Sequence, residues 1–206
     1  MYSKEYVRKT LIGHRSRMAG FYRATIIGAA AFLLISILVA PIVHELMHFF
    51  VLEFYHCYYE PHIRFTPEYG LYGNLAQFCA LSPGKEALVS GAGVLVNYAI
   101  ATVLFMLVPV IYRKGMIIHA NFFMYAALGF LSDPLFYFFA SEGDMINILW
   151  LLKKEAWAPL LPVLGLLTFS LAMAYVYRHM ERFIEDYMRI EQEVKEAEAF
   201  IDEIRR

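Results

Sequence analysis

Long apolar stretches separated by short polar segments dominate this chain. Nearly continuous apolar residues fill the ranges 24–55, 88–112, 116–140 and 157–177. At 1.5 Å per residue, each stretch is long enough to cross the roughly 30 Å hydrocarbon core of a bilayer as an α-helix. The pattern predicts an all-α polytopic membrane protein with about four transmembrane helices.

Residues 56–87, between the first two apolar stretches, have a different character. They are more polar and contain helix breakers: Pro61, Pro67, Gly70, Gly73 and Pro83. The order HIRF, PEYG, LYG within this segment is typical of two short strands joined by a turn. We therefore expect a short β-hairpin-like loop after the first transmembrane helix. Pro41 predicts a kink inside that helix, because proline lacks the N–H that a helix needs.

The C-terminal segment has a third kind of pattern. From Met180 onward, apolar residues alternate at spacings of four and three with charged residues between them: Phe183, Tyr187, Ile190, Val194, Ala197, Ile201 and Ile204. Such a heptad seam predicts a C-terminal amphipathic or coiled-coil helix. It can pack on its own chain, or it can form a homo-oligomer or partner contact through residues 180–206.

Composition supports a membrane protein and excludes an ordinary soluble domain. Of the 206 residues, 60% are hydrophobic and only 18% are charged. The formal net charge of -1 gives no reason to expect nucleic-acid binding. The first 23 residues are nonetheless basic, which predicts either an interfacial arm on anionic lipid or a solvated cytosolic tail. Two cysteines, Cys57 and Cys79, are too few for a disulfide framework, and we expect ordinary thiols.

The candidate chemistry lies in the first apolar stretch, where His44-Glu45-Leu46-Met47-His48 forms an HExxH motif. Four residues apart on a helix, His44 and His48 lie on one face and can bind one metal ion. Glu45 is placed to act as general base on a zinc-bound water. Ionisable side chains at membrane depth are costly, and a divalent metal would compensate for that cost. The motif therefore predicts one zinc ion per chain.

Catalytic zinc usually takes three protein ligands, so the motif needs a third. Asp144 follows Gly143, where the backbone can bend, and begins an apolar helix; a simple N-cap role is the alternative. Asp133, Glu142 and Glu68 are the other candidates. Asp133 precedes a proline that interrupts the third apolar stretch, and an Asp before Pro commonly marks a turn.

Together these features resemble the site-2 protease family of intramembrane zinc metalloproteases. The resemblance rests on the HExxH in a membrane helix, on SGAGVLVN ending at Asn97, and on the Asp144 that opens a later apolar helix. It covers roughly residues 30–150. The family often has Gly at the position of Met47, Gly-Pro at Gly93-Val94, and glycines after Asp144.

The resemblance implies an intramembrane zinc metalloprotease that hydrolyses peptide bonds of membrane-spanning substrates. In that assignment His44, His48 and Asp144 bind zinc, Glu45 is catalytic, and Asn97 positions the substrate or only forms an interhelical hydrogen bond. The alternative is a non-proteolytic zinc-binding or pseudoprotease membrane protein that acts through partner binding.

These predictions divide the chain into three parts: a basic interfacial arm (1–23), a transmembrane metalloprotease domain (24–178) and a charged amphipathic helical tail (179–206). The distribution of Lys and Arg predicts that the N- and C-termini are cytosolic and that the 56–87 loop is outside. The family resemblance implies the reverse orientation, with the active site open to the cytosol.

Overall fold

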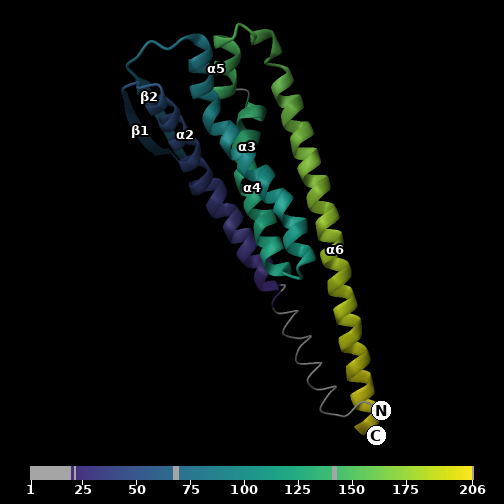
Figure 1. Ribbon diagram of the computed structural model, residues 1–206. Helices are drawn as coiled ribbons and strands as arrows, with labels where there is room; N and C mark the ends of the chain where they lie inside the picture. Colours follow the sequence, from purple (N-terminus) through teal and green to yellow (C-terminus); the bar gives the residue numbers. More distant parts are fainter. Residues whose placement is uncertain (1–19, 21, 67–69, 141–142, 206) are drawn as a thin grey trace.

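Four long helices form the protein, and most of their length is in one bundle (Figure 1). The computed structural model describes residues 20, 22–66, 70–140 and 143–205. Within this part of the chain, four helices are long and apolar enough to cross a membrane: Tyr22–Phe54, Pro83–Arg113, Ile117–Ala140 and Leu160–Phe200. The predicted all-α polytopic fold is therefore confirmed, and the protein is a multi-pass membrane protein.

The first helix is irregular just before Pro41. It contains a π-helical turn, η1 (Ile35–Val39), followed by α2 (Ala40–Phe54), and Ala40 N–H donates to Ile35 O. We expected a kink at Pro41, and the helix instead widens into a π-helical turn directly before this residue. In that turn the hydrogen bonds span five residues rather than four, and Pro41, which has no N–H, follows it. The backbone of α4 (Ile117–Ala140) packs closely here, since a Cβ on Gly129 would lie 2.8 Å from Ile35 Cβ.

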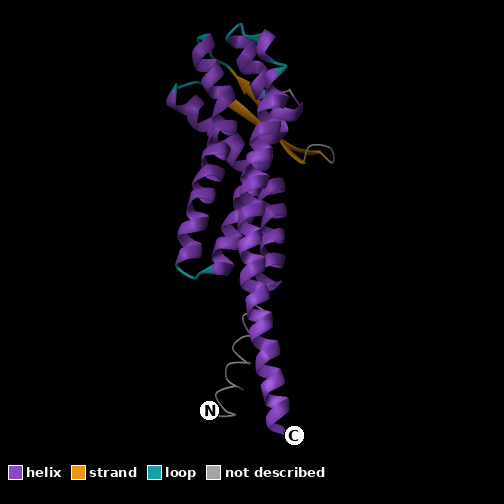
Figure 2. Ribbon diagram, turned by 90° about the vertical axis from the view of Figure 1, so that its right-hand side faces the viewer, coloured by secondary structure: helices purple, strands orange, loops and turns teal. Residues whose placement is uncertain are grey.

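The predicted hairpin follows the first helix. Strand β1 (Tyr59–Thr66) pairs antiparallel with β2 (Gly70–Gln77), with Tyr59 opposite Gln77 and Thr66 opposite Gly70. The hairpin prediction is confirmed, with strands longer than the sequence pattern indicated. Figure 2 shows the two strands beside the helices in the upper part of the bundle.

Helices α3 (Pro83–Arg113) and α4 (Ile117–Ala140) are joined by a tight turn in which Gly115 has a φ of 74°. The interruption predicted at Asp133-Pro134 is wrong, because α4 continues through Pro134. Proline is tolerated within transmembrane helices where neighbouring groups satisfy the backbone.

The last part of the chain comprises α5 (Asp144–Leu151), a short 3-10 turn η2 (Glu155–Trp157) and α6 (Leu160–Arg205). Helix α6 has 46 residues, about 69 Å at 1.5 Å per residue, so it projects far beyond the bundle (Figure 1). The predicted tail is a continuous extension of the fourth membrane helix rather than a separate element.

The heptad seam of α6 is described only in part. Phe183 is 2% exposed and packs with Val108, Ala120 and Met124 of α3 and α4. The other side chains of the seam lie outside the described residues, so contact with a second copy or another partner stays a prediction. Residues 1–19 and 21 of the basic arm also lie outside the described part of the chain.

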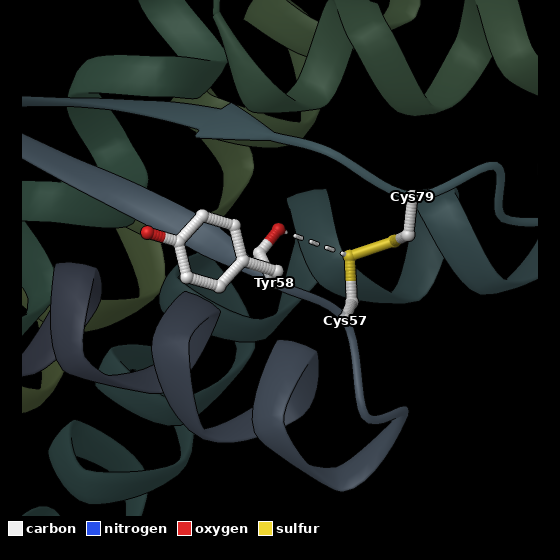
Figure 3. The surroundings of a disulfide bond; sticks show 3 residues. All are labelled: Cys57, Tyr58 and Cys79. Carbon is white, nitrogen blue, oxygen red and sulfur yellow. Dashed lines mark hydrogen bonds between the residues drawn. A yellow bond between two sulfur atoms is a disulfide. The ribbon is translucent and has the colours of Figure 1, made fainter.

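Cys57 and Cys79 form a disulfide, with their Cα atoms 5.5 Å apart (Figure 3). The expectation of ordinary thiols was therefore wrong. The reason lies in the hairpin register: Tyr59 pairs with Gln77, and each cysteine lies two residues beyond this pair. The bond joins the end of α2 to the segment after β2, and it closes the base of the hairpin.

Candidate metal centre

The two histidines of the HExxH motif lie one turn apart on α2 and face the interior of the bundle. His44 is 1% exposed and His48 is 4% exposed. Their ring centroids are 4.7 Å apart. The helical spacing therefore has the predicted consequence, since both imidazoles reach the same small region.

The hydrogen bonds of the histidines determine which nitrogens are available to a ligand. His48 Nδ1–H donates to the backbone carbonyl of Val89 at 2.6 Å, and His44 Nδ1–H donates to Asp133 Oδ2 at 2.8 Å. Both rings use Nδ1 for these bonds, so Nε2 is the atom of each ring that can bind a metal once it carries no proton.

Asp144 meets both of these Nε2 atoms. Its Oδ2 lies 2.8 Å from His44 Nε2 and 3.3 Å from His48 Nε2. Ligand atoms that bind one zinc tetrahedrally at 2.0–2.2 Å lie about 3.4 Å from one another. Asp144 Oδ2 thus already lies at nearly that separation from each of the two imidazole nitrogens, although Asp144 is 100 residues from His44.

Helix α5 holds Asp144 in this position. Gly143 precedes the helix with a φ of 63°, a conformation that glycine adopts without strain, and Asp144 is the first helical residue rather than its N-cap. Asn147, one turn later, donates from Nδ2 to Ser90 Oγ of α3 at 2.7 Å. Gly91 of α3 allows Ile148 to approach, since a Cβ at Gly91 would be 3.2 Å from the Ile148 side chain.

Asp144 lies outside the four membrane-spanning segments and stays ionised at neutral pH. Burial alone would raise the pKa of its carboxyl group, but the hydrogen bonds with His44 and His48 outweigh burial and lower that pKa to about 2. A carboxylate is the form that binds a cation, so Asp144 needs no deprotonation step before it can do so.

Glu45 completes a group of three residues that can hold a metal ion. One potential ligand atom from each of His44, Glu45 and His48 lies within 4.8 Å of the others. Glu45 is only half-buried. Its carboxylate is therefore close to the two histidines and partly accessible.

The other residues predicted for the site, Asn97 and the alternative third ligands, are not part of this group. Asn97 is fully buried on α3, and its Nδ2 donates to Ala40 O and to Asp133 Oδ2, both at 2.9 Å. The interhelical alternative for Asn97 is thus present, whereas contact with a substrate stays a prediction. Of the alternative third ligands, Glu68 and Glu142 lie outside the described residues.

Asp133 was expected to mark a turn, and that expectation was wrong. It lies within α4 and accepts hydrogen bonds from His44 and Asn97. Asp133 meets the Nδ1 atom of His44, on the opposite side of the ring from Asp144. Its local sequence gave no signal of this role, because both of its donors come from other helices.

His44 is also confined on its ring faces. Tyr137 stacks on the imidazole with a centroid distance of 5.0 Å and an interplanar angle of 16°. Gly93 of α3 leaves room for the ring, since a Cβ there would lie 2.4 Å from His44 Cδ2. Position 93 therefore has a steric requirement for glycine.

A methyl group at position 93 should disturb the site directly. We expect Gly93→Ala to displace His44 and to weaken metal binding at this site at least about tenfold, because a 2.4 Å contact cannot be kept. Gly84→Ala on the same helix is the matched control, as no atom lies within 4 Å of its added Cβ. Zinc titration of both purified variants tests this expectation, and equal affinities would contradict it.

Comparison with protein-family models, with curated proteins and with solved structures finds no match for this chain. Inference about its function therefore depends on the site itself.

Proposed function

We propose that this protein is an intramembrane zinc metalloprotease of the site-2 protease type. The observation that carries the proposal is the convergence of Asp144 Oδ2 on the Nε2 atoms of His44 and His48, at 2.8 and 3.3 Å. A carboxylate from α5 and two imidazoles from α2 form the His-His-Asp donor set expected of a catalytic zinc site, which leaves a coordination position for water or substrate.

The donor set fits zinc better than it fits the hard cations. Imidazole nitrogen suits zinc and related transition metals, whereas Mg²⁺ and Ca²⁺ prefer all-oxygen sites. Both cysteines are held in the disulfide, so no thiolate competes for the ion. A bound zinc ion would polarise the scissile carbonyl and make a water molecule acidic enough to attack it near neutral pH.

Glu45 would move the protons in this reaction. It follows the first ligand directly and lies with its carboxylate near both histidines, half-buried. A carboxylate in that place can take a proton from the attacking water and deliver it to the leaving amine. Asn97 would position the substrate from α3, where its amide already donates a hydrogen bond to Ala40 O of the helix that carries the histidines.

The substrates would be membrane-spanning segments. His44 lies ten residues before the end of α2 at Phe54, about 15 Å along the helix, and this depth supports a site within the apolar bundle. A substrate has to unwind locally there, because the carbonyls and N–H groups of an intact helix are already hydrogen-bonded to one another.

We further propose that the termini are cytosolic and that the site opens towards the opposite side. The hairpin and α5 lie at one end of the bundle (Figure 1), and the disulfide closes the base of this hairpin. Disulfides persist mainly in oxidising compartments. Within residues 22–66, 70–140 and 143–205, the Lys and Arg residues in segments at this end are Arg64, Lys85, Lys153 and Lys154, and the others lie towards the opposite end. The positive-inside rule therefore agrees with the disulfide and opposes the orientation implied by the family resemblance.

Reporter fusions test this orientation. A reporter that is active only outside the cytosol should be active when fused in the hairpin at residue 75 and inactive at the C-terminus. Electrophoresis of unreduced and reduced protein from intact cells should also show that Cys57 and Cys79 are joined. The reverse reporter pattern together with free thiols would contradict the proposed orientation.

Cleavage by purified protein tests the proposed activity. The full chain is reconstituted into liposomes with single-span peptides that carry helix-destabilising residues at different depths, and products are identified by mass spectrometry. We expect cuts within the spanning segment that stop after treatment with 1,10-phenanthroline and return when zinc is added. Zinc-loaded protein that cleaves none of these peptides would favour the non-proteolytic alternative.

A further inference from the structure

We propose that Asp133 is a positioning residue of this site, which fixes the orientation and tautomer of His44, and that Asn97 holds Asp133 in place. The inference rests on the proposed zinc function of the same residues. It assigns to Asn97 the role of holding Asp133, which orients the ligand His44, in addition to any contact with substrate.

Asp133 approaches His44 from the side opposite to Asp144. His44 Nδ1–H donates to Asp133 Oδ2 at 2.8 Å, whereas Asp144 Oδ2 lies 2.8 Å from Nε2. A carboxylate on Nδ1 keeps the proton there and leaves the Nε2 lone pair for the metal. Asp133 is therefore placed as an outer partner of a ligand and not as a ligand itself.

Asn97 connects this carboxylate to the helix that bears the histidines. Its Nδ2 donates to Asp133 Oδ2 and to Ala40 O, each at 2.9 Å, and its side chain is fully buried. Ala40 lies one turn before His44 on α2. Asn97 thus fixes α4 and α2 against each other at the level where Asp133 meets His44.

Asp133 is ionisable, and this distinguishes its bonds with His44 and Asn97 from a simple interhelical contact. A neutral pair is sufficient for such a contact elsewhere in the protein, as between Asn147 and Ser90. An ionisable side chain at membrane depth is costly and usually has a functional reason. Asp133, whose side chain is 11% exposed, would offset the positive charge of an ion bound to His44 and make Nε2 a stronger donor.

The second histidine shows the same geometry without the charge. His48 Nδ1–H donates to the Val89 carbonyl at 2.6 Å. Both rings are therefore oriented through Nδ1, but only the His44 bond has an ionisable acceptor. A side-chain substitution, that of Asp133, can therefore remove the acceptor of the His44 bond, whereas the acceptor of the His48 bond is backbone.

Zinc titration of metal-free full-length protein in detergent tests the proposal, combined with ¹⁵N NMR of the histidine rings. We expect Asp133→Ala to weaken zinc binding about 10–100-fold and to change the tautomer of His44. Asp133→Asn, which can still accept from Nδ1–H, should keep the tautomer and lose about tenfold in affinity. Ser132→Ala is the matched control, because Ser132 is the neighbour on α4 and its hydroxyl donates to Gly129 O of its own helix.

The outcomes separate this inference from the proposed function. Wild-type zinc affinity and an unchanged His44 tautomer in both Asp133 variants would overturn the positioning role, even if their thermal unfolding midpoint falls. In that case Asp133 would be a structural contact only, and the zinc site would stand. If the wild-type protein itself binds no zinc, the proposed function fails first.

Discussion

Replacing Glu45 with Gln should leave zinc bound and reduce peptide-bond cleavage about 10²- to 10⁴-fold, the range expected for loss of a general base. The amide is the same size as the carboxylate but cannot take a proton from water. Because the donor atoms of His44, His48 and Asp144 are unchanged, the zinc content should match that of the wild type. Initial rates of product formation in liposomes measure the effect.

Glu53→Gln provides the control for that experiment. Glu53 lies on the same helix, two turns after Glu45, and is exposed. It should retain wild-type cleavage and zinc content. Equal rates from the Glu45 and Glu53 variants would show that Glu45 does not act as the base.

The Asp144→Ala variant is expected to lose most of its zinc affinity. We expect a loss of more than about 100-fold, beyond the range that outer partners of a ligand usually contribute, because this residue supplies one of three protein donors. The two histidines would still be presented by α2, so the helices should form normally. Metal content after dialysis against a zinc buffer, with circular dichroism of the same sample, measures the two properties separately.

A matched variant in the same short helix tests whether α5 as a whole matters or only its carboxylate. Asn147→Ala removes the hydrogen bond to Ser90 and loosens the contact with α3, but it keeps Asp144. Its zinc affinity should fall by much less than that of Asp144→Ala. Similar losses in both variants would mean that α5 acts only through its packing.

The parts of the fold that sequence alone predicted are those encoded locally. The four spans follow from unbroken apolar stretches, and the hairpin follows from its turn residues. His44 and His48 share a face because helical geometry requires it. The start of α5 is also encoded locally, because Gly143 allows the backbone to bend and Asp144 is a polar residue at the beginning of an apolar helix.

The predictions that failed concern tertiary partners. The pairing of Cys57 with Cys79 depends on the strand register, which their spacing of 22 residues does not reveal. Asp133 was taken for a turn residue because its local neighbour is proline. Its hydrogen-bond partners are His44 and Asn97, which belong to other helices. Likewise, Pro134 did not end α4, because the surrounding bundle allows the helix to continue.

X-ray absorption at the zinc edge of purified wild-type protein, together with its metal content, tests the central claim most directly. We predict one zinc ion per chain with two imidazole nitrogens, further oxygen ligands and no sulfur. Protein that stays free of zinc at micromolar zinc, or a spectrum with a sulfur shell or a single imidazole, would contradict a centre built from His44, His48 and Asp144.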